Sequence, residues 1–177
     1  VSFDDGDHWQ ALHLNMPAVP IIDLTIREAD LVAATTGQGL WILDDIAPLR
    51  QVTPDIARAN AFLFRPSTAW RVRASLAGNS PPPSAVALHY LVGPNVSGPV
   101  TIEIIESATG DVIRRFSSAP ADGSAPDVTP IPGTFGLHRA WWDVQYTPID
   151  GRGVAVLPGV YQVRLMAGAT TLRQAVS

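Results

Sequence analysis

Short runs of alternating apolar and polar residues, separated by glycine and proline, dominate this sequence. Successive side chains of a β-strand point to opposite faces of the sheet, so such runs are typical of half-buried strands. The 177 residues include 14 glycines and 16 prolines, which suit many short strands joined by tight turns. We therefore expect an all-β chain that forms one large domain or two small ones.

Composition and charge narrow the range of partners. The chain is 46% hydrophobic and 16% charged, as a folded chain is. Its net charge is -4, and its 12 basic residues are arginines that stand singly or in pairs. Nucleic-acid binding needs clustered cations, so we expect no nucleic-acid partner. No apolar run reaches the roughly 18 residues of a membrane span, and the lack of cysteine excludes disulfides and thiolate metal sites.

The first 50 residues predict an antiparallel meander. A turn at residues 4–7 precedes an alternating strand at 9–14. Three further strands are expected at 21–26, 30–35 and 39–43, with very short connections. A small open meander leaves a face and both edges unpaired, so it is not a stable domain alone. Three strands with a part-strand before them are typical of a propeller blade.

Residues 51–60 are expected to be a linker, because the alternation is lost between Pro48 and Pro54. Thr53 and Pro54 predict the cap and first position of one short helix there. Residues 61–177 then predict about seven short strands with regularly spaced turns, typical of an immunoglobulin-like or fibronectin-III-like β-sandwich. A long loop is expected at 119–136. The expected strands are 61–64, 70–74, 85–92, 100–106, 112–116, 137–146, 161–165 and 170–176.

Ser2, Asp4, Gly6 and Trp9 follow the pattern Ser, any residue, Asp, any residue, Gly, two of any residue, Trp. This pattern resembles the Asp box, or BNR repeat, of sialidase-like and sortilin-like β-propellers. In such a turn the Ser and Asp side chains satisfy backbone amides, Gly takes the strained position and Trp packs into the blade. The chain begins within the motif, so we expect a fragment or a processed product.

Two further stretches extend the resemblance over nearly the whole chain. Residues 33–45, AATTGQGLWILDD, look like the closing blade of bacterial proteins of these families, which commonly reads ATHGRGIWILDD. Thr36 stands where His is usual, and Gln38 where Arg is usual. Residues 61–177 resemble the immunoglobulin-like tail that often follows such propellers, and the FlgD immunoglobulin-like module, through the stretches 100–104, 110–114, 136–143 and 157–161.

The resemblance implies the C-terminal part of a protein that is secreted, periplasmic or in the cell envelope. Residues 1–50 would be the last blade or blades of an Asp-box propeller, 51–60 a linker, and 61–177 the sandwich. The partners would be upstream blades of the same protein and a protein or glycan ligand. In this reading residues 1–50 expose a large apolar surface when isolated, because the neighbouring blades are missing.

No catalytic set is predicted. The four histidines have no recognised metal spacing: His8, His13, His89 and His138. A sialidase would need an arginine triad and a tyrosine nucleophile, yet only Arg27 lies in the core of the blade and the three tyrosines lie in the second half. We expect no catalytic residue, cofactor or metal site in this chain, and whether the parent protein is an enzyme stays open.

Trp141 and Trp142 are the candidate contacts for a glycan or a partner. Neighbours on a strand face opposite ways, so one ring lies in the core and the other points outward. An outward tryptophan can stack on a sugar or cover another part of the protein. The sequence thus leaves two hypotheses: a non-catalytic region that acts as a structural cap or a protein or glycan interaction module, and the accessory end of a sialidase-like glycoside hydrolase whose active site lies upstream.

Overall fold

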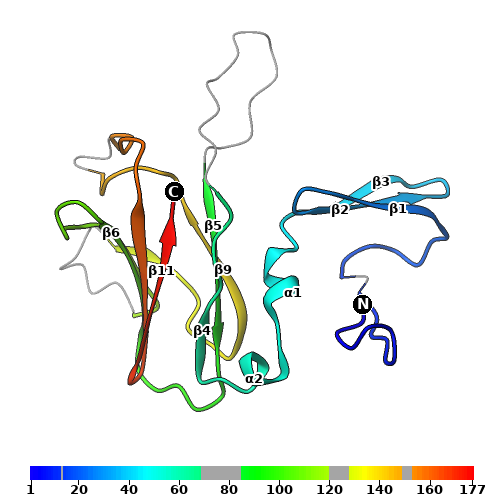
Figure 1. The fold of residues 1–177 in the computed structure, drawn as a ribbon, viewed down its shortest axis with the longest axis horizontal. Helices are drawn as coiled ribbons and strands as arrows, with labels where there is room; N and C mark the ends of the chain where they lie inside the picture. The colour runs from blue at the N-terminus through cyan, green and yellow to red at the C-terminus, as the bar shows by residue number, and fades with distance from the viewer. Residues whose placement is uncertain (13, 69–84, 120–127, 149–152) are drawn as a thin grey trace, which may run out of the picture. The chain divides into compact units, whose positions relative to one another are not determined.

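The computed structural model describes residues 1–12, 14–68, 85–119, 128–148 and 153–177 (Figure 1). The chain forms two compact units, an N-terminal unit, Val1–Ala57, and a C-terminal unit, Arg58–Ser177. Strands make up most of the regular structure, which agrees with the all-β expectation. The division lies within residues 51–60, where the sequence predicts a linker.

A three-stranded antiparallel sheet in the order β1-β2-β3 organises the N-terminal unit. Its strands are β1 (Ile21–Arg27), β2 (Asp30–Thr35) and β3 (Gly39–Leu43), close to the predicted limits. Arg27 pairs with Asp30, which leaves a two-residue turn between β1 and β2. The β2–β3 turn is closed by the Thr35 hydroxyl, which donates to a backbone carbonyl of the next strand at 2.7 Å.

Two short helices follow this sheet. The helix α2 (Pro54–Ala57) begins where the sequence predicts it, and Thr53 Oγ1 accepts the amide of Ile56 at 3.3 Å. The helix α1 (Ala47–Gln51) was not expected. Pro48 lies at the first helical positions, where the missing amide costs nothing, so this proline starts a helix as well as ending the alternation.

The prediction of a strand at residues 9–14 is wrong for the residues of this segment that the structure describes. Residues 9–12 and 14 belong to no strand. The Gln10 amide donates to the Val1 carbonyl at 2.8 Å, but the segment does not join the sheet. An alternating sequence becomes a strand only where a neighbouring backbone supplies hydrogen-bond partners.

Two sheets form the C-terminal unit. The smaller sheet has the order β4-β5-β9, with β4 (Ala61–Leu63), β5 (Val86–Val92) and β9 (Gly136–Trp142). The larger sheet has the order β11-β10-β6-β7-β8, and all its neighbours are antiparallel except β7 and β8. Its strands are β6 (Val100–Glu106), β7 (Val112–Ser117), β8 (Val128–Pro130), β10 (Tyr161–Ala167) and β11 (Thr170–Val176).

One apolar core joins the two sheets, which lie face to face in Figure 1. Alternate residues of the long strands enter it, among them Leu88 of β5, Ile102 of β6 and Leu165 of β10, each fully buried. Burying one such side chain contributes about 1.5–3 kcal/mol. The C-terminal unit therefore has a complete core of its own.

Two predicted limits in this unit need correction. The strand β8 lies inside the loop expected at 119–136, because Val128 and its neighbours pair in parallel with the edge of β7. The strand β9 ends at Trp142 and not at 146, since Val144 takes a φ of 56°, which no strand residue adopts. The strand expected at 70–74 lies outside the described residues.

Candidate functional site

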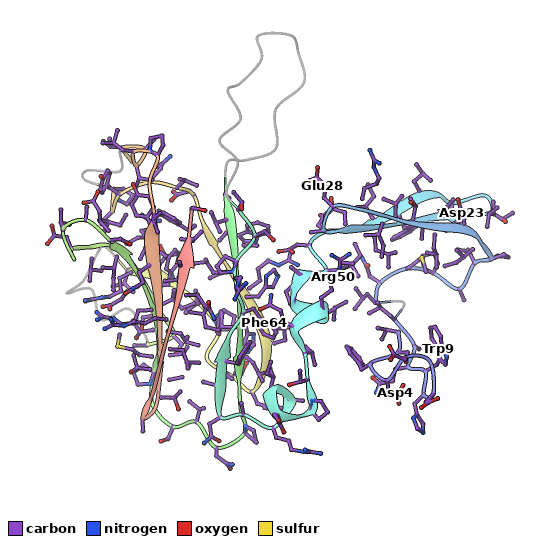
Figure 2. The ribbon with its side chains drawn as sticks, in the orientation of Figure 1. Asp4, Trp9, Asp23, Glu28, Arg50 and Phe64 are labelled. Carbon is purple, nitrogen blue, oxygen red and sulfur yellow. The ribbon has the colours of Figure 1, made fainter. Side chains whose placement is uncertain are left out.

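Side-chain hydrogen bonds hold the turn at residues 2–9. Ser2 Oγ accepts the Gly6 amide at 2.8 Å and donates to Asp4 Oδ1 at 2.8 Å. Asp4 Oδ1 also accepts the His8 amide at 2.9 Å, and Trp9 Nε1 donates to the Gly6 carbonyl at 3.0 Å. Gly6 has a φ of 103°, which side chains disfavour. The four residues of the predicted motif are thus brought together in one turn, where Figure 2 labels Asp4 and Trp9.

These bonds favour the charged form of Asp4. The His8 amide, the His8 ring and the Ser2 hydroxyl, in that order, hold the Asp4 pKa below its ordinary value of 3.8. His8 Nδ1 lies 2.6 Å from Asp4 Oδ2, and the His8 side chain is 87% exposed. The contact of acid and imidazole therefore fixes a surface turn.

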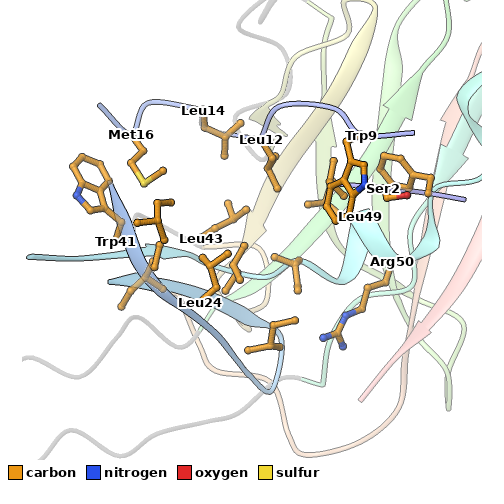
Figure 3. Close-up of a pocket in the computed structure, with 18 of the residues that line it drawn as sticks. Ser2, Trp9, Leu12, Leu14, Met16, Leu24, Trp41, Leu43, Leu49 and Arg50 are labelled. Carbon is orange, nitrogen blue, oxygen red and sulfur yellow. The ribbon is translucent and has the colours of Figure 1, made fainter. Parts of the chain in front are cut away.

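Trp9 does not pack inside a sheet as a blade tryptophan would. It is 75% exposed and borders an open hollow of about 910 Å³. Every residue around this hollow belongs to the N-terminal unit. Leu12, Leu14 and Met16 lie on one side of it, and the sheet with α1 lies on the other (Figure 3).

One face of the sheet forms the floor of the hollow. Cross-strand partners share a face, and the register aligns Leu24 with Ala33 and Trp41 in one row across β1, β2 and β3. A second row joins Ile26, Leu31 and Leu43. We call these six residues the apolar sheet face.

The apolar sheet face is poorly covered. Leu24 is 57% exposed and Ile26 is 52% exposed, and none of the seven residues of β1 is buried. The opposite face is also apolar in part, since Leu40 and Ile42 alternate with Trp41 along β3 and are 70% and 58% exposed. A sheet with apolar residues on both faces is typically covered on both.

Trp41, one of the residues around the hollow, has a buried polar atom without a partner. Trp41 Nε1 is inaccessible to solvent and has no hydrogen-bond acceptor among the described residues. Leaving such a donor unsatisfied costs about 1–3 kcal/mol. The ionisable side chains of the lining are Asp5 and Arg50, beside a majority of apolar groups. This lining suits an apolar occupant.

The structure separates the two candidate tryptophans of β9. Trp142 is 1% exposed, donates from Nε1 to the Gln145 carbonyl at 3.0 Å and packs against Tyr161 in a T-shaped arrangement. Trp141 is 55% exposed, and the Arg139 guanidinium lies 5.2 Å from its ring centre. Of these two tryptophans, Trp141 is the one that a ligand can contact, and the Arg139 guanidinium already lies over its ring.

The sequence reasoning missed a charged cluster on the larger sheet. Glu103 is 3% exposed and pairs with Arg115 and Arg164, which are its neighbours on the adjoining strands. A glutamate between two isoleucines, Ile102 and Ile104, was the available signal, because a buried carboxylate needs cationic partners.

Several expectations concern other kinds of site. The described residues contain no group of three or more His, Cys, Asp or Glu residues that could hold a metal ion. None of their helices has the length and apolar character needed to cross a membrane. His13 lies outside the described part of the chain.

We compared the chain with protein-family models, curated proteins and solved structures. The chain matches no protein-family model, no curated protein and no solved structure.

Proposed function

We propose that this chain is the non-catalytic C-terminal region of a secreted, Asp-box β-propeller protein. In this proposal the N-terminal unit belongs to the last blade. The C-terminal unit is an immunoglobulin-like sandwich that acts as a structural cap or as a protein or glycan interaction module. The apolar sheet face, left open over the hollow, is the observation that carries the proposal.

The two units differ in how complete they are. The C-terminal unit buries alternate residues of its long strands in one core, although Phe135 and Leu157 are exposed, whereas β1 of the N-terminal unit buries none. Conformational entropy opposes the ordering of every residue, so an ordered sheet needs apolar burial in return. A three-stranded sheet with one poorly covered apolar face, and exposed apolar residues on the other, therefore belongs inside a larger assembly.

A neighbouring blade fits this requirement. Blades of a propeller pack face to face, so each sheet is covered on both sides. Covering Leu24 and Ile26 fully would contribute up to about 1.5–3 kcal/mol each. The partners are thus upstream blades of the same protein.

The mass of the polypeptide in its native source tests this proposal. We expect a product several times heavier than 18.9 kDa, with further Ser-x-Asp-x-Gly-x-x-Trp turns before Val1. A native product of 18.9 kDa that is monomeric would exclude upstream blades.

A further inference from the structure

The two units carry opposite net charges. The N-terminal unit contains nine Asp and Glu residues and two arginines, a net charge of -7. The C-terminal unit contains seven Asp and Glu residues and ten arginines, a net charge of +3, and the two values together give the -4 of the chain. The acidic character of the whole chain thus hides a basic C-terminal unit.

Part of this positive charge is aligned across the larger sheet. The register places Arg173 of β11 opposite Arg164 of β10, then Glu103 of β6, then Arg115 of β7. Glu103 alternates with Ile102 and Ile104, which lie in the core, so the row is on the outer face. Four neighbouring strands at about 4.7–4.9 Å spacing make the row about 14 Å long.

Glu103 fixes two of the three arginines. Arg115 Nε donates to Glu103 Oε1 at 3.0 Å, and its Nη2 lies 2.8 Å from the same oxygen. Arg164 donates from Nε to Glu103 Oε2 at 2.8 Å, and also from Nη2. Paired guanidinium contacts of this kind hold each side chain in one orientation. Both oxygens of the Glu103 carboxylate are satisfied. The cluster of Glu103, Arg115 and Arg164 still carries one net positive charge.

Arg173 adds a second uncompensated charge. It is exposed, and the ion pairs among the described residues give it no carboxylate. It also lies directly opposite Arg164. Like charges directly opposite each other destabilise a strand pair. An anion between the two guanidinium groups would turn this repulsion into attraction.

We propose that this arginine row, Arg115, Arg164 and Arg173, binds an acidic polysaccharide through its uronate carboxylates. Planar carboxylates match the guanidinium fork, and Arg173 presents its fork while Arg115 and Arg164 direct Nε and Nη2 to Glu103. The row is long and lies on the outer face of a sheet, so it suits a chain of repeated anions and not one small ion. Thr101, Thr171 and Gln162 lie on the same face beside the row and offer neutral hydrogen bonds to sugar hydroxyls.

This site is independent of the proposed blade. It lies wholly within the C-terminal unit, and it uses neither the hollow nor Trp141. Failure of either proposal therefore leaves the other in place.

Binding of polygalacturonate to the full 177-residue chain tests the arginine row, with dextran as the uncharged control. Calorimetry at low ionic strength should show binding of polygalacturonate and no binding of dextran. Arg173→Gln should weaken it about tenfold, the effect of losing a hydrogen bond between charged groups. Arg58→Gln is the matched control: it removes the same charge from an exposed arginine outside the row and should change the affinity less than about twofold.

Three results would overturn the proposal. The first is no binding of polygalacturonate. The second is an equal loss of affinity in Arg173→Gln and Arg58→Gln, which would show attraction by overall charge alone. The third is equal or tighter binding of poly-L-glutamate, which would assign the row to acidic peptides. Arg173 is exposed, so Arg173→Gln leaves the core intact, and circular dichroism checks that it folds.

Discussion

Trp142 is 1% exposed, whereas Trp141 beside it on β9 is 55% exposed. Trp142→Ala should lower the free energy of unfolding of the C-terminal unit by about 3–5 kcal/mol, because it leaves a cavity in the core. Trp141→Ala should cost about 0.5–1 kcal/mol, the size of an exposed cation–π contact. Urea denaturation followed by circular dichroism measures both, and equal losses would contradict the assignment of the two rings.

Gly93 is predicted to tolerate no side chain. A Cβ there would lie 2.5 Å from the Ala59 carbonyl oxygen and 2.8 Å from Asn60 Cα, both of which are backbone atoms. Gly93→Ala should therefore destabilise the C-terminal unit by about 1–3 kcal/mol. Gly159→Ala is the control, since its nearest neighbour would be 3.9 Å away, and its thermal midpoint should stay close to that of the unmodified chain. A Gly93→Ala chain as stable as the control would refute the close approach.

Glu28 is strained in the turn between β1 and β2. Its φ is 57°, in the left-handed region that costs a side chain about 1–2 kcal/mol. Glu28→Gly should relieve this strain, less about 0.5–1 kcal/mol for the greater freedom of glycine in the unfolded chain. Amide exchange in β1 and β2 should slow by several-fold. Ala29→Gly, next to it and without a positive φ, should speed exchange, and the same direction in both variants would speak against a strained turn.

Tyr90 should make the C-terminal unit sensitive to alkali. Burial raises the Tyr90 pKa from 10.0 to about 12, and its hydroxyl donates to the Pro132 carbonyl at 2.6 Å. Because the pKa is raised in the folded state, this contribution to stability is complete below pH 10.0 and is lost as the pH rises towards 12. Tyr90→Phe should be less stable at neutral pH and should lose less stability between these two pH values. An unchanged alkaline slope would show that Tyr90 is not the group responsible.

Alternation predicted the strands well where at least one neighbouring strand lies in this chain. The strands β2, β3, β6 and β11 have the expected limits, and each pairs with a strand of its own sheet. The prediction of a strand at 9–14 was wrong because alternation indicates which side chains are apolar, and not whether a backbone partner is present. The sequence did not predict the strand β8 for the opposite reason: its composition is typical of a loop, but its backbone pairs with β7.

Of the candidate sites, the sequence predicts the one held by local bonds and misses the one that depends on strand pairing. The bonds of the turn at Ser2 and Asp4 follow from local chemistry, so the sequence alone predicts them. The alignment of Arg173 with Arg164 and Glu103 depends on the register of strands far apart in the chain. No local pattern records that register, so the arginine row emerged only from the fold.

The central claim is that further blades of the same polypeptide cover the apolar sheet face. Amide hydrogen exchange, compared between the 177-residue chain and the polypeptide isolated from its native source, tests it most directly. We predict that β1, β2 and β3 exchange much faster than β6 and β10 in the 177-residue chain, and become strongly protected in the native polypeptide. Protection of β1–β3 that equals that of β6 and β10 already in the 177-residue chain would contradict it.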